Sequence, residues 1–165
     1  MAEISTKPYL LRALFEWCVD NGYTPHIAVK VDAKTQVPAE YVKAGEITLN
    51  YYEAGPEGGS RLGGGLPFVF LHGGGPGASA WSNFGPALPR FAENFRTLLV
   101  DQPGFGASDK PEVTANYFRH SASYLVQLLD ELQIERVHLL GNSLGGGTAT
   151  RFALEYPDRV GRLVL

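Results

Sequence analysis

The chain has 165 residues, of which 44% are hydrophobic, and its formal net charge is −3. This size and composition indicate one soluble globular domain or two small ones, and no basic block favours nucleic acid or an anionic membrane as a partner. No apolar run is long enough to cross a bilayer, and the first 20 residues lack the pattern of a secretion signal, which favours the cytoplasm. One Cys and four scattered His exclude an internal disulfide and form no recognisable metal-binding pattern.

The first 50 residues predict a helix followed by short strands. Capping residues, a three- and four-residue apolar spacing and a terminal Asn-Gly indicate an amphipathic helix over residues 5–22. Alternating apolar residues predict a strand over residues 25–32, and residues 45–55 form another strand candidate. Cys18 on the apolar helix face and His26 at a strand entrance are interpreted as structural residues.

The rest of the chain alternates predicted strands with predicted helices, and 18 of the 20 glycines lie at residue 55 or later. Strands are predicted over residues 66–72, 96–101, 136–141 and 159–165, and helical segments over about 81–95, about 115–132 and from 144 onward, the first of them broken near Pro86 and Pro89. Continuous apolar strands joined by helical crossovers predict a mostly parallel sheet covered on both faces. Residues 55–65 are interpreted as a flexible connection.

The pattern Gly-x-Ser-x-Gly occurs at residues 141–145, between a predicted strand and a predicted helix. This context is typical of a nucleophile elbow, in which a strained turn lifts the serine hydroxyl above the sheet. Side chains at Gly141 and Gly145 would collide with the neighbouring strand and helix. Ser143 is therefore the predicted nucleophile, and a glycine-rich turn with an idle serine is the alternative.

A second glycine-rich segment, "HGGGPG" at residues 72–77, follows another predicted strand. In a fold with this elbow such a segment supplies half of the oxyanion hole. The Leu144 N–H is expected to combine with an N–H group from Gly74 or Gly75. Asp101 closes the next strand and is interpreted as a carboxylate that braces a loop.

The general base is the missing part. A nucleophile elbow of this kind is followed in the chain first by the acid and then by the histidine of the triad. The 22 residues from 144 to 165 contain Glu155 and Asp158 but no His. The histidines before the serine are interpreted as structural residues: His72, which would brace the oxyanion loop, His120 and His138. Negligible turnover by this chain alone is therefore expected.

Residues from about Leu49 to Leu165 resemble the α/β-hydrolase superfamily, and more closely the meta-cleavage-product hydrolases, which cut carbon–carbon bonds in ring-fission products of aromatic and steroid degradation. The resemblance is carried by "LNYYEAG", "FLHGGGPGASAWSNF", "LLVDQPGFGASDK" and "HLLGNSLGGGTATRFALEYPDRVGRLVL". It implies ketonisation of a dienol, attack on the ketone carbonyl and C–C cleavage, without a metal or an organic cofactor. The residue roles it implies are Ser143 as nucleophile, Gly74, Gly75 and Leu144 as the oxyanion pocket, and Asn83 and Asn142 as groups that face the dienoate substrate.

Residues from about Lys7 to Asn50, "KPYLLRALFEWCVDNGYTPHIAVKVDAKTQVPAEYVKAGEITLN", resemble the start of stringent starvation protein B, an adaptor that delivers tagged proteins to a Clp protease. The resemblance implies a first helix that makes a dimer contact and a small barrel that holds the tag. Tyr9, Leu10, Phe15 and Trp17 would then be available for pairing, or would pack on the chain's own strands. The match ends before most of that barrel.

These observations predict an α/β fold: a truncated α/β-hydrolase-type, mostly parallel sheet with flanking helices, preceded by an N-terminal helix and short strands. The predicted domains are an adaptor-like segment, residues 1–50, and the first part of a hydrolase core, residues 51–165. The predicted function is a C–C-bond serine hydrolase portion that takes a small-molecule dienoate. A peptide-binding adaptor and a recombined or engineered chimera are the alternatives. A homodimer through the N-terminal helix or an exposed sheet edge is also expected.

Overall fold

The computed structural model describes residues 37–56, 61–113 and 116–165. All of them belong to one compact unit, residues 31–165. The helix predicted over residues 5–22 and the strand predicted over residues 25–32 lie outside the described residues, as do Cys18 and His26.

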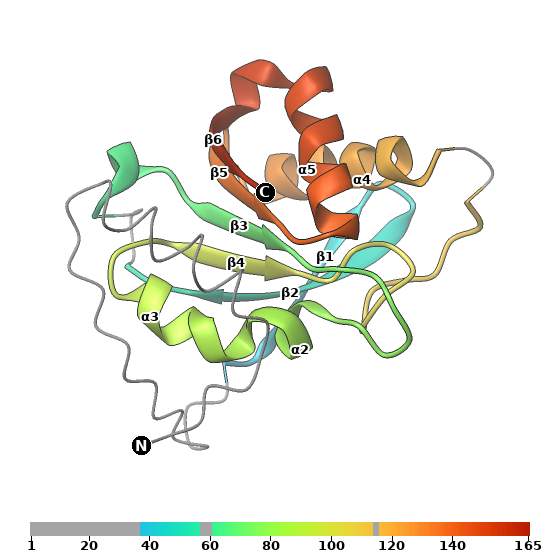
Figure 1. Cartoon of the computed structure of the whole chain (residues 1–165), viewed down its shortest axis with the longest axis horizontal. Coiled ribbons are helices and arrows are strands. Elements are labelled where there is room, and N and C mark those ends of the chain that lie inside the picture. The colour runs from blue at the N-terminus through green and yellow to red at the C-terminus, as the bar shows by residue number, and fades with distance from the viewer. Residues whose placement is uncertain (1–36, 57–60, 114–115) are drawn as a thin grey trace. The chain divides into compact units, whose positions relative to one another are not determined.

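A single six-stranded sheet organises the described residues, with the strand order β1-β2-β4-β3-β5-β6 (Figure 1). The strands are β1 (Ala39–Ala44), β2 (Ile47–Ala54), β3 (Phe68–Leu71), β4 (Thr97–Val100), β5 (Val137–Gly141) and β6 (Val160–Val164). β3 runs parallel to β4 and β5, and β6 runs parallel to β5. β2 is antiparallel to both β1 and β4. The predicted mostly parallel sheet is therefore confirmed, with an antiparallel pair added at one side.

The antiparallel side begins with a tight hairpin. β1 was not predicted from its sequence, whereas β2 matches the strand candidate over residues 45–55. Ala44 pairs with Ile47, so only Gly45 and Glu46 form the turn, and Gly45 takes a positive φ of 59°. Glycine at the first central position is what a two-residue hairpin turn of type II′ requires. β2 continues without interruption across the predicted domain boundary at residue 50, and the division into two domains remains a proposal.

Helices cover both faces of the sheet, as Figure 1 shows: α4 and α5 on one side, α2 and α3 on the other. Their bounds are α2 (Ala80–Phe84), α3 (Leu88–Ala92), α4 (Tyr117–Glu131) and α5 (Leu144–Glu155), with short 3₁₀ turns at Gly63–Gly65, Gly85–Ala87 and Pro157–Arg159. The predicted break in the segment 81–95 is confirmed. A proline lacks the N–H that a continuing helix needs, so Pro86 and Pro89 each stand in the first turn of a new element.

The sheet has a hydrophobic core on each face, and the side chains of β3 enter both, since successive residues of a strand point to opposite faces. Val69 and Leu71 are buried in the cluster that α4 and α5 complete. Phe70 points the other way, and its ring lies 5.2 Å from that of Phe84 and 4.9 Å from that of Phe91. Burial on both faces explains why the strand is apolar throughout. In the described ranges, no helix combines the length and apolar character that a membrane crossing needs.

Candidate active site

Ser143 stands directly after β5 and directly before α5, with φ of 52° and ψ of −110°. A non-glycine residue rarely adopts this region, so the turn is strained. A Cβ atom on Gly145 would lie 2.0 Å from the Leu71 carbonyl oxygen, and one on Gly141 would lie 2.4 Å from the Gly145 carbonyl oxygen. The steric reason predicted for both glycines is therefore confirmed: backbone atoms occupy the space that any side chain would need.

Two polar groups of the turn have no hydrogen-bond partner among the described residues. Ser143 is exposed, and its hydroxyl has no hydrogen-bond partner in the described part of the chain. Within the turn, Gly145 N–H donates to Asn142 O (2.9 Å) and Gly147 N–H donates to Ser143 O (3.1 Å). The Leu144 N–H, at the first position of α5, has no such bond among the described residues. The positive end of the helix dipole is therefore next to the serine hydroxyl.

The glycine-rich segment 72–77 lies beside this turn. A Cβ atom on Gly73 would be 3.5 Å from Cβ of Ser143, and one on Gly74 would be 3.3 Å from Cδ2 of Leu144. Among the described residues, the N–H groups of Gly74 and Gly75 make no hydrogen bond, although Gly75 O accepts one from Ala78 N (3.1 Å). The structure therefore brings the predicted nucleophile and all three predicted oxyanion donors to one edge of the sheet.

His72 is fully buried and uses both ring nitrogens. Gln102 N–H donates to Nε2 (3.0 Å), so the proton of the neutral ring sits on Nδ1, which donates to Gly73 O (2.8 Å). Burial lowers the pKa of His72 below its usual 6.5, against the opposing effects of the Gly73 carbonyl and the Asp101 charge. His72 therefore braces the glycine-rich segment predicted to form the oxyanion loop, and has no free nitrogen with which to act as a base.

The amides of Asn83 and Asn142, predicted to face a substrate, contact each other. Asn142 Nδ2 donates to Asn83 Oδ1 (3.4 Å), which also accepts from Gly73 N–H (3.1 Å). Asn83 Nδ2 donates to Ser82 Oγ (3.3 Å). The Asn83 carbonyl oxygen is therefore already shared by two protein donors, whereas Asn142 Oδ1 keeps its lone pairs for another group. Of the two, Asn142 is better placed to face a ligand.

Asp101 is buried at the end of β4 and each of its carboxylate oxygens accepts a backbone N–H. Oδ1 accepts from Ala80 (2.6 Å), the first residue of α2, and Oδ2 accepts from Ala107 (2.9 Å) in the next loop. This arrangement agrees with the interpretation of Asp101 as a bracing carboxylate. Both oxygens are thus engaged by the backbone, and no imidazole donates to either of them in the described part of the chain.

The remaining candidate acids and bases in the described residues lie elsewhere. The His138 side chain is buried in β5, five residues before Ser143, which is about 16 Å along an extended strand. His120 lies in α4 with its ring 5.0 Å from that of Tyr124. Glu155 forms ion pairs with two arginines of α4 and α5, and Asp158 is exposed in the turn before β6. In the described part of the chain, no imidazole hydrogen-bonds to Ser143.

Two residues that support the site were not singled out from the sequence. Gln102 Nε2 donates to His72 O (2.7 Å), and Ser121 of α4 donates to Gln102 Oε1 (3.2 Å). Both are buried. A sequence signal did exist for Gln102, because it directly follows a parallel strand, and the carboxyl ends of such strands meet at the site edge.

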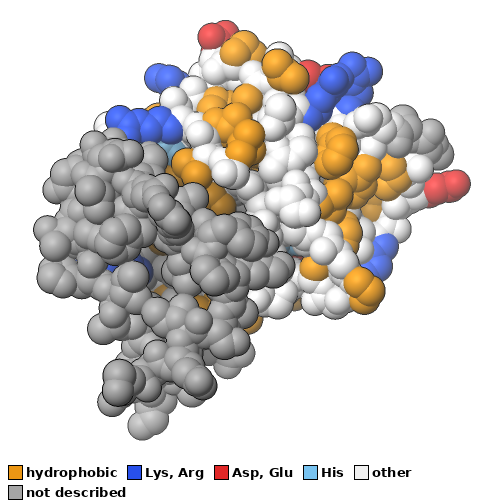
Figure 2. Space-filling model, viewed as in Figure 1, with side chains coloured by type: hydrophobic (Ala, Val, Ile, Leu, Met, Phe, Trp, Pro, Cys, Tyr) orange, Lys and Arg blue, Asp and Glu red, His pale blue; other side chains and the backbone are white. Residues whose placement is uncertain are grey.

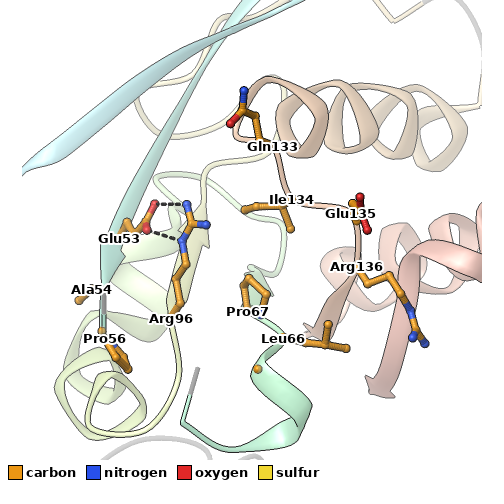
Figure 3. A pocket seen from close by; sticks show the side chains of 12 residues that line it. Glu53, Ala54, Pro56, Leu66, Pro67, Arg96, Gln133, Ile134, Glu135 and Arg136 are labelled. Atoms are coloured by element: carbon orange, nitrogen blue, oxygen red, sulfur yellow. Dashed lines mark hydrogen bonds and ion pairs between the residues drawn. The ribbon is translucent and has the colours of Figure 1, made fainter. Parts of the chain in front are cut away.

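A cavity of about 680 Å³ lies at the opposite edge of the sheet, at the amino ends of β3, β4 and β5 (Figure 3). Glu53 and Arg96 form an ion pair on one side of it (2.6 Å), and Leu66, Pro67 and Ile134 line the other side. Because the predicted nucleophile follows the carboxyl end of β5, this cavity is not part of the site around Ser143. Among the described residues, no group of three or more His, Cys, Asp or Glu could hold a metal ion.

Residues 67–165, which is 60% of the chain, match the family model of the alpha/beta hydrolase fold. The chain belongs to this family. Residues 5–56 match the family model of stringent starvation protein B, so both resemblances seen in the sequence are confirmed. Within that second match, residues 39–54 form β1 and β2, the antiparallel side of the hydrolase sheet.

Two curated relatives show which members of this family the chain resembles. The chain is 52% identical over 98 residues to a 2-hydroxy-6-oxononadienedioate/2-hydroxy-6-oxononatrienedioate hydrolase of Paraburkholderia phymatum, an alignment that covers 59% of this chain and 34% of the relative. It is 40% identical over 121 residues to a 2-hydroxy-6-oxo-6-phenylhexa-2,4-dienoate hydrolase of Comamonas testosteroni, covering 73% and 40%. The chain thus spans well under half the length of these curated relatives.

Solved structures of the same family also resemble this chain. A meta-cleavage product hydrolase (CumD) from Pseudomonas fluorescens superimposes with a TM-score of 0.68 at 33% identity, covering 76% of this chain and 43% of that one. The 2-hydroxy-6-oxo-6-phenylhexa-2,4-dienoate hydrolase of Rhodococcus superimposes with a TM-score of 0.68 at 30% identity, covering 78% and 45%. The predicted α/β-hydrolase-type fold is confirmed, and the two neighbours are named as a meta-cleavage product hydrolase and a dienoate hydrolase.

Proposed function

We propose that residues 47–165 carry the nucleophile and the oxyanion pocket of a hydrolase that cleaves a carbon–carbon bond in dienoate ring-fission products. The observation that carries this proposal is the strained, exposed turn at Ser143, set beside unbonded backbone N–H groups at the carboxyl edge of a parallel sheet. The names of the relatives support the substrate class, since they act on 2-hydroxy-6-oxo dienoates.

The chemistry follows from the groups at this edge. Ser143 Oγ would add to a ketone carbonyl once a base removes its proton, and the carbonyl oxygen would become an oxyanion. The N–H groups of Leu144 and of Gly74 or Gly75 would donate to that oxygen. One missing donor of this kind typically costs about 3–4 kcal/mol of transition-state stabilisation. The amide of Asn142 would face the dienoate, next to Asn83.

The proposed activity of this chain by itself is negligible, because no described imidazole reaches Ser143. The test is incubation with 2-hydroxy-6-oxo-6-phenylhexa-2,4-dienoate, following loss of the dienolate absorbance, with Ser143→Ala as the control. We expect equal, slow loss in both proteins. Rapid loss that depends on Ser143 would show that a base is present and that this proposal of an incomplete triad is wrong.

Substrate-class recognition is tested separately from turnover. Titration of the chain with the same dienoate, followed by the absorbance change of the bound dienolate, should saturate. Asn142→Leu should weaken binding about tenfold, the effect of losing one hydrogen bond to a charged ligand. Asn94→Leu, which changes a half-buried amide in the turn before β4, at the opposite edge of the sheet, is the matched control. Equal binding by all three proteins would contradict the assignment of Asn142.

An adaptor role is a second candidate function because residues 5–56 match stringent starvation protein B. Against it, part of that match is built into the hydrolase sheet as β1 and β2. Fluorescence anisotropy with a labelled degradation-tag peptide separates the two functions. We expect no saturable binding at micromolar protein, and saturable binding there would favour the adaptor.

A further inference from the structure

Two successive peptide groups before the oxyanion donors are held almost completely by the protein. In the peptide between residues 72 and 73, His72 O accepts from Gln102 Nε2 (2.7 Å) and Gly73 N–H donates to Asn83 Oδ1 (3.1 Å). In the next peptide, Gly73 O accepts from His72 Nδ1 (2.8 Å). Of the four polar groups in these two peptides, the Gly74 N–H alone makes no hydrogen bond with the described residues.

The geometry of a trans peptide determines in which direction the Gly74 N–H points. No cis peptide occurs among the described residues, and in a planar trans peptide the C=O and N–H bonds point in opposite directions. Because His72 holds the Gly73 C=O on its own side, the Gly74 N–H must point to the other side. That side is away from the buried His72 ring, where Gly74 and Ser143 are both exposed, and Gly74 lies next to the serine turn, since a Cβ atom on Gly74 would be 3.3 Å from the Leu144 side chain.

The ring of His72 is itself fixed in one tautomer. Gln102 N–H donates to Nε2, which leaves the ring proton on Nδ1, opposite the Gly73 carbonyl. Ser121 of α4 in turn holds the Gln102 side chain (3.2 Å), and all three residues are buried. The orientation of the loop therefore depends on a network from α4 through the end of β4 to the end of β3.

We propose that His72 is a positioning residue that aims the Gly74 N–H into the oxyanion pocket through the Nδ1–H···O=C bond to Gly73, with Gln102 fixing the tautomer. The proposal rests on the proposed function of Ser143 and the oxyanion pocket. It assigns His72 a role in oxyanion stabilisation without contact to substrate, and it makes Gly74 rather than Gly75 the loop's main donor. Among the described residues, no comparable hydrogen bond orients the peptide between residues 74 and 75 and its N–H.

Two substitutions of His72 distinguish its effect on the direction of the Gly74 N–H from its contribution to the stability of the fold. The Asn side chain places a nitrogen donor where Nδ1 is, so His72→Asn keeps the bond to Gly73 O and loses the acceptor for Gln102 N–H. The Gln side chain places an oxygen acceptor where Nε2 is, so His72→Gln keeps the acceptor and loses the bond to Gly73 O. Each variant loses one buried hydrogen bond, and thermal unfolding of both checks that their stabilities are similar.

The functional measurement is the rate at which a fluorophosphonate labels Ser143 at alkaline pH, read by intact mass. Ser143 Oγ attacks phosphorus, fluoride leaves, hydroxide takes the proton, and the phosphoryl oxygen carries the developing charge in the oxyanion pocket. We expect His72→Gln to slow labelling at least about tenfold, against 10²–10³ for a fully removed donor. His72→Asn should stay within about threefold of the unmodified chain. Equal slowing in both variants, in proportion to lost stability, would overturn the proposal.

A spectroscopic readout keeps the two proposals distinguishable. If the unmodified chain is labelled no faster than Ser143→Ala, the assignment of Ser143 fails, and the aiming of Gly74 is then judged by ¹⁵N and ¹³C NMR. The His72 ring must show a protonated Nδ1 and an unprotonated Nε2. The Gly73 carbonyl carbon, read through the Gly74 nitrogen, must shift upfield in His72→Gln and not in His72→Asn. The opposite tautomer, or an unmoved carbonyl resonance, would overturn the role of His72 whatever Ser143 does.

Discussion

Glycines around the serine turn are required by contact with backbone atoms, which cannot move aside as side chains can. A Cβ atom on Gly145 would meet the Leu71 carbonyl oxygen at 2.0 Å, well inside van der Waals contact. The next residue of the same helix, Gly146, has its nearest such neighbour, Gly141 O, at 3.3 Å. The two positions therefore differ sharply in what they tolerate, although both are glycines in the first turn of α5.

We expect Gly145→Ala to lower the free energy of unfolding by about 3 kcal/mol or more, because the strand and the helix must separate to make room. Gly146→Ala should change it by no more than about 1 kcal/mol, since the better helix propensity of alanine offsets a slight crowding. Urea unfolding of both variants measures the difference. Equal stability of the two variants would contradict the close approach of α5 to β3.

Burial of His72 links stability to pH. Its pKa in the folded protein lies below 6.5, so at pH values under 6.5 the unfolded chain takes up a proton that the folded protein does not. Stability due to this group is therefore fully present above pH 6.5 and declines as the pH falls toward the folded pKa. Protonation would also place an Nε2–H against the Gln102 N–H.

We expect the free energy of unfolding of the unmodified chain to fall more steeply between pH 7 and about 5 than that of His72→Gln, which cannot titrate. Urea unfolding at a series of pH values measures both slopes. The other histidines and the carboxylates are common to the two proteins, so they cancel in the comparison. Parallel slopes would mean that His72 has an ordinary pKa in the folded protein.

Among the elements, α2 depends most on what surrounds it. It has five residues, and an isolated helix of that length is not stable in water. A capping box between Ser79 and Ser82 closes its first turn, and Asp101 Oδ1 accepts the N–H of Ala80. The other oxygen of Asp101 holds the loop after β4. One buried carboxylate thus joins the start of α2 to the loop after β4.

We expect Asp101→Asn to lower the free energy of unfolding by about 2 kcal/mol, because the amide can accept from only one of the two N–H groups and presents its own N–H to the other. Asp158→Asn, which makes the same chemical change at an exposed site, should have little effect. Thermal unfolding of both variants tests this. A similar loss of stability in both would show that Asp101 is not the link between these segments.

For the molecule as a whole, the two edges of the sheet differ. β1 carries two charges that discourage pairing with another chain, Glu40 and Lys43, beside the exposed Tyr41, whereas β6 carries one charge, Arg162, beside Leu163 with 37% of its surface exposed. Leu154 of α5 is 72% exposed and Leu165 is 68% exposed. Figure 2 shows hydrophobic side chains on the part of this face where α4 and α5 lie. The β6 edge is therefore the side from which self-association is expected.

We expect the chain to self-associate in a concentration-dependent way, and Leu163→Lys to reduce this, because a charge on an edge strand opposes pairing with a second copy. Tyr41→Lys, at an exposed position on the opposite edge, is the matched control and should leave association unchanged. Sedimentation velocity over a range of concentrations measures all three proteins. A monomeric unmodified chain, or equal effects of both substitutions, would contradict the role of β6.

The sequence was sufficient for features that depend on neighbouring residues. The order of strands and helices from residue 66 onward, the breaks at Pro86 and Pro89 and the serine turn with its flanking glycines all follow from local periodicity and from backbone sterics within a few residues. The proposed oxyanion loop could be placed for the same reason, because it directly follows an apolar strand. The edge strand β1 escaped prediction because four of its six side chains are exposed and only Val42 and Ala44 pack against the core, which is too short an alternation for the sequence to display.

Tertiary structure alone decided which polar groups of the site are already bonded and which remain available. His72 and its partner Gln102 are 30 residues apart, and Asn83 and Asn142 are 59 apart, so no local pattern contains these hydrogen bonds. A hydrogen bond requires its donor and acceptor within about 3 Å and in line, a condition set by how strands β3, β4 and β5 align. The sequence therefore determined where the proposed nucleophile and the proposed oxyanion loop lie along the chain, and the packing of the sheet determined that the Gly74 N–H, next to the serine turn, has no hydrogen-bond partner among the described residues.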